Sequence, residues 1–331
     1  MSISDRKEKN RRIHNKRDNM RKPKITVVGS SNTDLVAIVP KLPAPGETVM
    51  GSEFIIASGG KGANQAVAVA RIGADVTFIA KLGMDDNGEQ SLKNFKKDGI
   101  NTDFVFRDPD VTSGVALIFV DKTGENMLVP VPGANGKLSS DDIATARSAI
   151  ESADILVLQL EVPLDAVERA IAIAYESGVP IVLNPAPGRK LESSLIEKVS
   201  YITPNETEAE ILTDIKVIDD TTAREAGKKL LNLGAKTVII TMGKRGAMLV
   251  TQDESELIQA YVVESVDATA AGDAFNGGFA YAIASGKDIR KAIRFGNAVG
   301  AITVTKMGAQ PSMPTNEELK IFLRERNEEM M

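Results

Sequence analysis

Short apolar runs alternate along this chain with longer stretches in which apolar residues recur at helical spacing. Residues 25–29 (ITVVG) form the first run, residues 63–72 a helical stretch that ends at Gly73, and residues 76–80 the next run. Further strands are expected at residues 155–160, 180–183, 201–203, 237–241 and 247–251, and further helices at residues 87–97, 164–175, 224–233, 272–284 and 289–305. Short strands separated by helices of about ten to fifteen residues are typical of βαβ units. The pattern therefore predicts an α/β fold, a three-layer αβα body with a mostly parallel sheet.

Two insertions interrupt this alternation. Residues 34–58 contain strand-like segments and a Pro-Ala-Pro-Gly turn but no helix, and residues 112–132 contain two apolar runs around the sequence DKTG, a hairpin signal. We expect the two insertions to pair into a small sheet that projects from the body. Because such a sheet must bury one face, it is expected to cover a cleft, a partner subunit, or both.

The residue types in the chain exclude several kinds of site. The chain has no cysteine and a single histidine, His14, so it cannot build a disulfide, a cysteine zinc site, a multi-histidine metal site or a Ser-His-Asp triad. A formal net charge of -5 argues against a nucleic-acid-binding body. No apolar run is long enough to predict a membrane span, and without an apolar signal segment the cytoplasm is the expected compartment.

The first 24 residues carry ten Lys and Arg side chains against three acidic ones, with almost nothing apolar. Residues 1–22 are therefore expected to form a disordered basic tail, and residues 23–331 the folded domain. Two alternatives for the tail are a natural start of the protein at Met20 and a nucleic-acid or targeting role.

Residues 268–279 (ATAAGDAFNGGF) place small residues before an acidic one at the expected start of a helix. The backbone N–H groups of Ala270, Ala271 and Gly272, together with the positive end of the helix dipole, can form a pocket for an anion. Asp273 would lie beside that pocket, where its carboxylate can accept the proton of a hydroxyl that attacks phosphorus. The alternative is that Asp273 simply caps the helix.

A glycine-rich turn, SGGKGAN at residues 58–64, leads into the first helical stretch. It is not a Walker A loop, because neither the earlier glycine nor a Ser or Thr after the lysine is present. The turn can bring its backbone close to a ligand, to which Lys61 and Asn64 can offer hydrogen bonds. The alternative is an ordinary strand-to-helix connection.

Other polar side chains follow expected strands at their carboxyl ends, where open α/β sheets bind ligands. Asn32 and Asp34 come after the first strand, and Glu161 follows the run ILVLQL. Their acceptors and amide suit sugar hydroxyls, although Asn and Asp also form turns.

Two further motifs suit a nucleotide and its metal. In the sequence PNETE, Asn205 and Glu208 share a helix face and can hold the hydration shell of Mg²⁺, or they can cap a helix whose dipole favours acidic residues. The sequence TMGKRG at residues 241–246 permits a tight loop beside a nucleotide, with Lys244 or Arg245 facing either phosphate or solvent.

Two loops rich in oxygen atoms remain. Asp267 and Thr269 precede the anion pocket, and residues 306–312 (KMGAQPS) offer exposed carbonyls. If the two loops adjoin, their oxygens can hold a large monovalent cation. The residues themselves do not distinguish K⁺ from Na⁺ or from no ion.

In combination these motifs resemble the ribokinase-like carbohydrate kinases, the PfkB family. The resemblance runs from about residue 25 to the C-terminus and rests on nine sequences in the family order: GSSNTDLV (29–36), PAPGETV (43–49), GGKGANQAVA (59–68), LQLEVP (158–163), LNPAPGR (183–189), TPNETEAE (203–210), TMGKRGA (241–247), VDATAAGDAFNG (266–277) and KMGAQPSMP (306–314). It implies a Rossmann-like αβα body with a small β-sheet lid, and two lids that meet in a homodimer. Ala270 replaces the glycine of the common family form, and the anion hole is expected to survive because its backbone amides bind the anion.

The resemblance implies a role for each matching position. Asp273 would be the catalytic base, with an anion hole formed by Ala270, Ala271 and Gly272. Ribose would be held by Asn32, Asp34, Gly59, Gly60, Lys61, Asn64, Glu161 and Asp273. ATP would contact Asn205, Thr241, Met242, Gly243, Lys244, Arg245, Gly246, Gly272 and Asn297. Glu208 would organise Mg²⁺ through water, and K⁺ would be held, largely by carbonyls, at Asp267, Thr269, Thr303, Lys306, Gly308 and Ser312.

The activity that the resemblance implies is ATP-dependent phosphorylation of D-ribose at O5, giving ribose 5-phosphate and ADP. Kinases for deoxyribose, fructose or adenosine are the alternatives within this chemistry. A non-catalytic ligand sensor on the same fold would have no need for Asp273 and an intact anion pocket. A nicotinamide-dependent oxidoreductase would need a G-x-G-x-x-G turn after the first strand, where this chain has the sequence GSSN.

Overall fold

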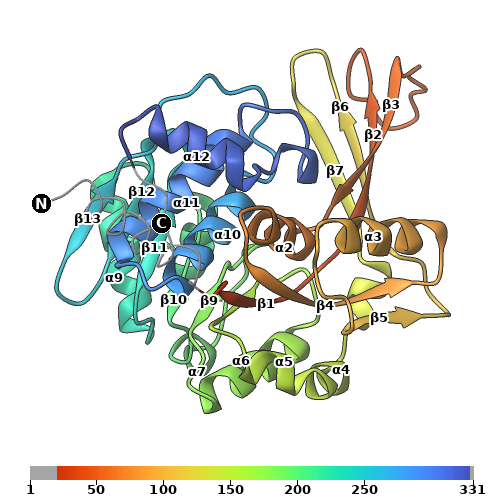
Figure 1. Cartoon of the computed structure of the whole chain (residues 1–331). Helices are drawn as coiled ribbons and strands as arrows, with labels where there is room; N and C mark the ends of the chain where they lie inside the picture. Colours follow the sequence, from red (N-terminus) through yellow and green to blue (C-terminus); the bar gives the residue numbers. More distant parts are fainter. Residues whose placement is uncertain (1–20, 329–331) are drawn as a thin grey trace, which may run out of the picture.

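The computed structural model describes residues 21–328, so the basic tail expected at residues 1–22 lies outside it except for its last two residues. The body is built on a nine-stranded sheet with the order β13-β12-β11-β10-β9-β8-β1-β4-β5 (Figure 1). Its strands are β1 Lys24–Val28, β4 Asp75–Gly83, β5 Val105–Asp108, β8 Ile155–Leu158, β9 Ile181–Leu183, β10 Tyr201–Ile202, β11 Val238–Thr241, β12 Ala247–Val250 and β13 Ser255–Ile258. Neighbours from β11 to β5 pair in parallel, whereas β12 and β13 pair antiparallel. The mostly parallel sheet is confirmed.

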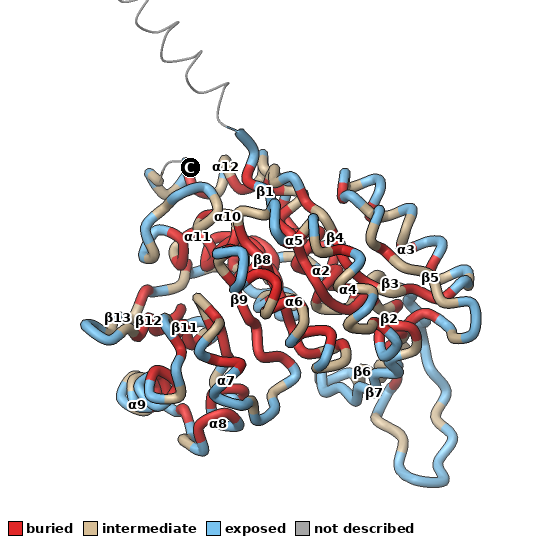
Figure 2. Tube along the Cα trace, turned by 90° about the horizontal axis from the view of Figure 1, so that it is seen from below, coloured by how far each residue is buried: buried red, intermediate tan, exposed pale blue. Residues whose placement is uncertain are grey.

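Helices cover both faces of this sheet, as the three-layer prediction requires. One face packs against α2 Lys61–Arg71, α3 Asp86–Lys97, α10 Ala271–Ala284, α11 Ile289–Thr303 and α12 Asn316–Arg324. The other packs against α4 Ser140–Thr145, α5 Arg147–Glu151, α6 Leu164–Glu176, α7 Ser193–Ile196, α8 Glu206–Thr213 and α9 Asp220–Asn232. Successive residues of a strand serve opposite faces: Val27 lies in the first core and Val28 in the second. Figure 2 shows the buried residues concentrated in the middle of the body, around β1, β8 and the helices packed on them.

The strand order reverses at β1, which lies between β4 and β8 and pairs in parallel with both. In open α/β sheets, ligands bind at the carboxyl ends of the strands at such a reversal. The polypeptide leaves β1 at Gly29, so the segments around this glycine are expected to line the site.

The two insertions pair into a separate four-stranded sheet, as the sequence predicts. Its order is β3-β2-β6-β7, with strands β2 Asn32–Ile38, β3 Glu53–Gly59, β6 Gly114–Val120 and β7 Asn126–Val131. We call this sheet the lid, which projects away from the body in Figure 1. Asp34 pairs with Ala57 and Ala116, so these residues share one face of the lid.

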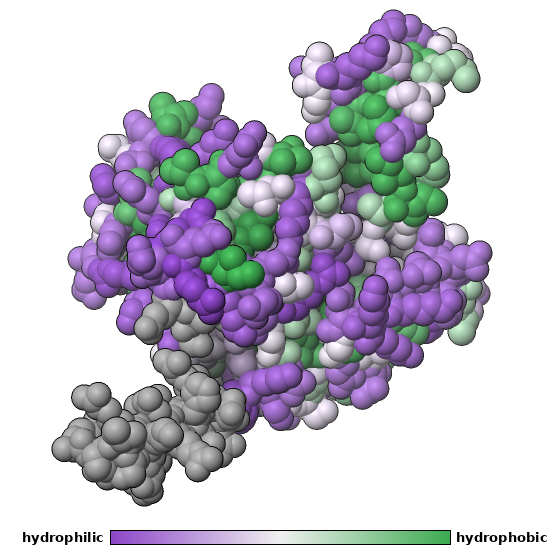
Figure 3. Space-filling view, turned by 45° about the horizontal axis from the view of Figure 1, so that its top comes forward, coloured by the Kyte–Doolittle hydropathy of each residue, from purple (hydrophilic) through white to green (hydrophobic). Residues whose placement is uncertain are grey.

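The opposite face of the lid carries large apolar side chains that solvent reaches. Leu35 pairs with Ile56 and Leu117, and Leu117 pairs with Val129 on the outer strand. Ile56 is 64% exposed and Val129 53% exposed. Figure 3 shows hydrophobic residues gathered over the projecting lid. An apolar surface of this kind is typical of an interaction site.

Small residues let the site-bearing helices approach closely. A Cβ added at Gly277 of α10 would lie 2.9 Å from Ala68 of α2, and one at Gly278 would lie 2.7 Å from Val299 of α11. Both contacts are tighter than ordinary packing allows, so α10 fits between α2 and α11 only because these positions are glycine. The beginnings of α2 and α10 are thereby held side by side at the carboxyl edge of the sheet.

The sequence pattern does not predict several short helices and strands of the structure. The helices α4, α5, α7 and α12 and the strands β5 and β13 were not expected, and most of them are shorter than three helical turns or lie at the sheet edge. Within residues 21–328, no helix combines the length and the apolar character needed to cross a bilayer.

Candidate active site

The glycine-rich turn at residues 58–64 connects the end of lid strand β3 to the start of α2 and packs against lid strand β2. A Cβ added at Gly59 would lie 2.3 Å from an Asp34 carboxylate oxygen, and Gly60 has a φ of +89°, a conformation that favours glycine. A Cβ at Gly60 would also lie 2.6 Å from the backbone nitrogen of Asn32. The turn therefore packs backbone against Asn32 and Asp34, and Lys61 begins α2 directly beside them.

Asp273 lies in the first turn of α10 and is 5% exposed. Its carboxylate accepts hydrogen bonds from Asn64 Nδ2 at 2.9 Å and from Gln65 Nε2 at 3.2 Å, both on α2. The residue before the helix, Ala270, has a left-handed φ of 59°, and no side chain caps the helix there. Asp273 is thus directed toward α2, and the alternative that it caps its own helix is wrong.

The anion pocket expected before Asp273 lies open to solvent. Gly272 is exposed, and a Cβ added to it would meet no atom within 4 Å. Ala270 and Gly272 lie at the beginning of α10, whose first backbone N–H groups have no partner within the helix. Between them, the N–H of Ala271 donates to the carbonyl of Ala268 at 3.2 Å. The open side of Gly272 leaves room for an anion beside the buried carboxylate of Asp273.

The negative charges of Asp273, Glu161 and Glu208 act on the Lys61 ammonium. Burial, together with the negative charges of Glu161 and Asp273, raises the pKa of Asp34 to about 6. Burial also raises the pKa of Asp273, although the positive charge of Lys61 opposes this effect. The pKa of Lys61 is raised in turn, chiefly by Asp273. Residues that are far apart in the sequence therefore lie together in one group, which we call the charged cluster: Asn32, Asp34, Lys61, Asn64, Glu161 and Asp273.

Two residues that the sequence analysis missed hold the cluster together. Ser30 Oγ donates to Glu161 at 2.5 Å, and the same carboxylate accepts the backbone N–H of Lys61 at 3.0 Å. The amide of Asn135 donates to Asn32 Oδ1 at 2.7 Å and accepts the backbone N–H of Ser31 at 2.8 Å. Ser30 lies in the motif GSSNTDLV, two residues before Asn32, whereas Asn135 lies in a short 3₁₀ segment that carries no sequence signal.

One buried acceptor in the cluster lacks a partner. Asn64 Oδ1 is among the three buried side-chain polar atoms in residues 21–328 that form no hydrogen bond. The nitrogen of the same amide binds Asp273, so its oxygen is directed elsewhere. A buried acceptor without a partner is costly, which favours a ligand hydroxyl as its donor.

Asn205 and Glu208 begin α8 with a reciprocal cap. Asn205 Oδ1 accepts the backbone N–H of Glu208 at 2.8 Å, and Glu208 accepts the backbone N–H of Asn205 at 2.9 Å and its side-chain N–H at 3.0 Å. The capping alternative is therefore confirmed. Burial raises the pKa of Glu208, which the charges of Lys61 and Asp273 also influence, so Glu208 faces the charged cluster.

The loop expected to contact a nucleotide lies beside α8. Thr241 pairs with Asn205 in an isolated bridge, and a Cβ added at Gly246 would lie 2.2 Å from the carbonyl oxygen of Ile258. The amide of Asn297 donates to that carbonyl and to the next one, at 3.1 Å each. Residues 241–246, the end of β13 and α11 therefore adjoin.

The two basic residues of this loop differ in their surroundings. Arg245 lies 3.5 Å from a Glu206 carboxylate oxygen and 3.4 Å from one of Asp220, so acidic side chains of α8 and α9 hold it. Lys244 is exposed. Of the two, Lys244 is the one left available to a phosphate.

The two oxygen-rich loops adjoin. The carboxylate of Asp267 accepts N–H groups from Thr269 at 2.9 Å and from Gly308 at 2.8 Å. Buried Ser312 donates its hydroxyl to the carbonyl of Ala309, and buried Thr303 donates to that of Val299. Each hydroxyl oxygen keeps lone pairs for a further partner.

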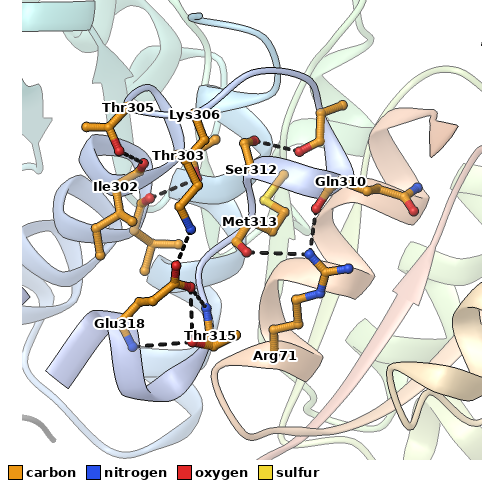
Figure 4. A network of polar contacts seen from close by, with 12 residues as sticks. Arg71, Ile302, Thr303, Thr305, Lys306, Gln310, Ser312, Met313, Thr315 and Glu318 are labelled. Carbon is orange, nitrogen blue, oxygen red and sulfur yellow. Dashed lines mark hydrogen bonds and ion pairs between the residues drawn. The ribbon is translucent and has the colours of Figure 1, made fainter. Parts of the chain in front are cut away.

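Side chains from outside brace the second loop, as Figure 4 shows. Arg71 at the end of α2 donates to the carbonyls of Gln310 at 2.6 Å and Met313 at 3.4 Å. The Lys306 ammonium pairs with Glu318. The Lys306 ammonium is therefore held by α12, outside this loop.

Comparison with known proteins identifies the family. Residues 22–316 match the family described as pfkB family carbohydrate kinase. The chain is 45% identical over 299 residues to the ribokinase of Haemophilus influenzae, covering 90% of this chain and 98% of that one. It is 38% identical over 300 residues to the deoxyribokinase of Salmonella typhimurium, with 90% and 98% covered.

Solved structures agree. The ribokinase of Arabidopsis thaliana complexed with ribose and ATP has a TM-score of 0.84 at 29% identity and covers 92% of this chain and 99% of its own. The ribokinase of Thermotoga maritima has a TM-score of 0.83 at 38% identity, with 91% and 99% covered. Fold, motif order and sequence identity therefore lead to one assignment: this chain belongs to the pfkB family of carbohydrate kinases.

Proposed function

We propose that the protein is a ribokinase, which transfers the γ-phosphoryl group of ATP to the 5-hydroxyl of D-ribose and releases ribose 5-phosphate and ADP. The observation that carries the proposal is the Asp273 carboxylate, buried beside the backbone amides at the start of α10 and oriented by Asn64. The ribokinase relatives at 40–45% identity support ribose as the substrate.

Asp273 acts as the general base in this proposal. Burial raises its pKa, which makes its carboxylate a stronger base than that of an exposed aspartate. It accepts the proton of the 5-hydroxyl as the hydroxyl oxygen attacks the γ-phosphorus in line with the departing ADP oxygen. The amides of Ala270, Ala271 and Gly272 donate to the phosphoryl oxygens, where negative charge increases in the transition state. Closure of the lid would exclude water, which otherwise competes as the acceptor.

The proposed ligand contacts extend over the whole carboxyl edge of the sheet. Ribose would be oriented by Asn32, Asp34, Gly59, Gly60, Lys61, Asn64 and Glu161. ATP would contact Asn205, Thr241, Met242, Gly243, Lys244, Arg245, Gly246, Gly272 and Asn297. Arg245 would do so through its backbone, because its side chain pairs with Glu206 and Asp220.

Mg²⁺ and K⁺ belong to the proposal as activating ions. Within residues 21–328, no three acidic or histidine side chains are grouped so that they could hold a metal ion by themselves. Mg²⁺ would be held by the phosphates and, through water, by Glu208. When bound, Mg²⁺ would neutralise phosphate charge. The oxygen donors of the adjoining loops fit K⁺, with contributions from Asp267, Thr269, Thr303, Lys306, Gly308 and Ser312.

A substrate panel tests the proposal. Turnover of ribose, deoxyribose, fructose and adenosine would be followed by coupled detection of ADP, with and without K⁺. We expect ribose to give the highest kcat/KM and K⁺ to raise it. The deoxyribokinase relative at 38% identity makes deoxyribose the second candidate, and a preference for it would overturn the assignment of ribose.

Because ATP is the phosphoryl donor, we further propose that the kinase domain, residues 23–331, works in the cytoplasm.

Protonation of Asp34 is expected to weaken ribose binding. Its pKa of about 6 means that roughly half of the Asp34 carboxylates are protonated at pH 6 and more at lower pH. A protonated carboxyl loses acceptor capacity for sugar hydroxyls, so ribose affinity should fall as the pH decreases through about 6. Calorimetric titration with ribose measures this fall. Asp34→Asn should bind ribose weakly at every pH without that step, and the same step in the variant would exclude Asp34 as its cause.

The apolar face of the lid is the proposed contact between two copies of the chain. Replacing Ile56, which is 64% exposed, with lysine puts a charge into that contact and should convert a dimer into monomers. Sedimentation velocity measures the change. Val262→Lys, at a position 96% exposed on the body, is the matched control and should leave the dimer intact. A dimer that survives Ile56→Lys would contradict a lid interface.

A further inference from the structure

A buried chain of amide side chains lies behind Asp273. Gln159 Nε2 donates to Gln65 Oε1 at 2.5 Å, and Gln65 Nε2 donates both to Asp273 Oδ1 and to Asn184 Oδ1, each at 3.2 Å. Both glutamines have no exposed surface, and Asn184 is 7% exposed. The chain connects the ends of β8 and β9 with α2 and α10, and none of its three amides is needed to contact a ligand.

The hydrogen-bond partners of these side chains define the orientation of each amide. Asn184 Nδ2 donates to the carbonyl of Thr203 at 3.3 Å, which leaves Asn184 Oδ1 facing Gln65. The carboxylate of Asp273 also accepts, so both neighbours require the nitrogen of Gln65. Gln65 Oε1 must then face Gln159, which presents its own nitrogen. Turning the Gln65 amide by half a rotation would place its oxygen against two acceptors.

Gly29, which directly follows β1, makes room for Gln159, the amide that lies farthest from Asp273 in this row of hydrogen-bonded side chains. A Cβ added at Gly29 would lie 2.0 Å from Gln159 Oε1, so only glycine leaves room for the Gln159 amide. Gln159 Oε1 is buried and forms no hydrogen bond. Such a group is costly, and its retention at the end of a chain that reaches Asp273 suggests a role other than stability.

We propose that Gln65 is a positioning residue for the general base: it holds one oxygen of Asp273 toward α2, and Gln159 keeps the Gln65 amide in the required orientation. The inference rests on the proposed function, in which Asp273 takes the proton of the sugar hydroxyl. With Asn64 holding the other oxygen, the carboxylate is fixed at both oxygens before the substrate binds. A base fixed in this way needs no reorientation when the hydroxyl arrives.

The charged groups that face Asp273 are Lys61 on α2, Glu161 after β8, Asp34 on β2 and Glu208 on α8. Burial raises the pKa of Asp273, and the Lys61 charge and the hydrogen bonds from Asn64 and Gln65 oppose this effect. Replacement of Gln65 by an apolar side chain of equal length leaves all four charged residues in place. A change in the protonation of Asp273 can then be assigned to the lost hydrogen bond.

The test measures the protonation of Asp273 directly. Protein with ¹³C-labelled aspartate carboxyls is titrated by NMR, and Asp273 is identified as the signal missing from Asp273→Asn. In Gln65→Met we expect the Asp273 midpoint to rise by about one pH unit, and the acidic limb of the kcat profile for ribose to rise with it. An unchanged midpoint would overturn the proposal. If the wild-type protein failed to phosphorylate ribose, the proposed function would fall while the NMR titration still decided the role of Gln65.

Two further variants complete the test. Gln159→Met does not touch Asp273, and we expect a smaller rise of the midpoint because the Gln65 amide is then free to turn. No rise in this variant would exclude Gln159 from the proposal, and a rise would support it even if Gln65→Met did not fold. Thr26→Val removes a partly buried hydrogen bond elsewhere, 2.8 Å from Thr26 Oγ1 to the carbonyl of Ala149, in the middle of β1. A midpoint that rose equally in Thr26→Val would show a general effect of destabilisation and overturn the proposal.

Discussion

Replacing Asp273 with asparagine is expected to lower kcat for ribose phosphorylation by about three orders of magnitude. Asparagine has nearly the same size and can still accept a hydrogen bond from Asn64, so the packing between α2 and α10 should persist. It cannot take up a proton from the sugar hydroxyl. The loss should therefore appear in kcat measured by coupled ADP detection at saturating ribose and ATP.

Nucleotide binding should behave in the opposite way. Removing a negative charge beside the γ-phosphate reduces repulsion, so the variant should bind ATP as tightly as the wild-type protein or more tightly in calorimetric titration. Asp154→Asn is a suitable control, because Asp154 pairs with Arg21 at the far end of the sheet. The Asp154→Asn variant should phosphorylate ribose at the wild-type rate. Wild-type turnover in Asp273→Asn would exclude Asp273 as the base.

The layers and the lid could be predicted from the sequence because their signals are local. Strand β8 is a continuous apolar segment, and β1 and β4 are mostly apolar and β-branched, as is typical of strands buried on both faces. The lid insertions were recognised because their strands lack the helices that separate the others. The short helices α4 and α5 were missed because five or six residues give too few turns for a periodic pattern.

The residues of the charged cluster could be predicted for a different reason. Lys61, Glu161 and Asp273 follow strands or begin helices at the carboxyl edge of the sheet, and Asp34 lies near the start of lid strand β2, which leaves that edge after β1. Their carboxylate and ammonium groups already indicate chemistry in the sequence.

The supporting amides could not be found in this way. Gln65 lies one residue after Asn64 and Gln159 lies one residue after β8, and nothing in their neighbours distinguishes them from ordinary surface glutamines. Their role depends on contacts between segments more than ninety residues apart in the sequence. Arg245 shows the same limit: Glu206 and Asp220, which engage it, lie on two other helices.

Replacing Gly62 with alanine is expected to damage both the fold and the site. A Cβ at Gly62 would lie 2.6 Å from the carbonyl carbon of Gly29 and from the backbone nitrogen of Ser30. These are backbone atoms at the end of β1 and cannot turn aside, so α2 must move away from the sheet. Such overpacking should lower the free energy of unfolding by about 2 kcal/mol in urea titrations followed by circular dichroism.

The direction of the change in the free energy of unfolding tests whether α2 packs closely on β1. Inside a helix, alanine is more favourable than glycine by about 1 kcal/mol, so without the contact to Gly29 the variant would be more stable than the wild-type protein. Gly136→Ala is the control, because its Cβ would meet only Pro132 at 3.4 Å, an ordinary contact. A stabilised Gly62→Ala would contradict the close packing of α2 on β1.

Since Lys61, Asn64 and Gln65 move with α2, kcat for ribose should also fall by about 100-fold. A destabilised variant with full turnover would show that the site does not depend on this contact.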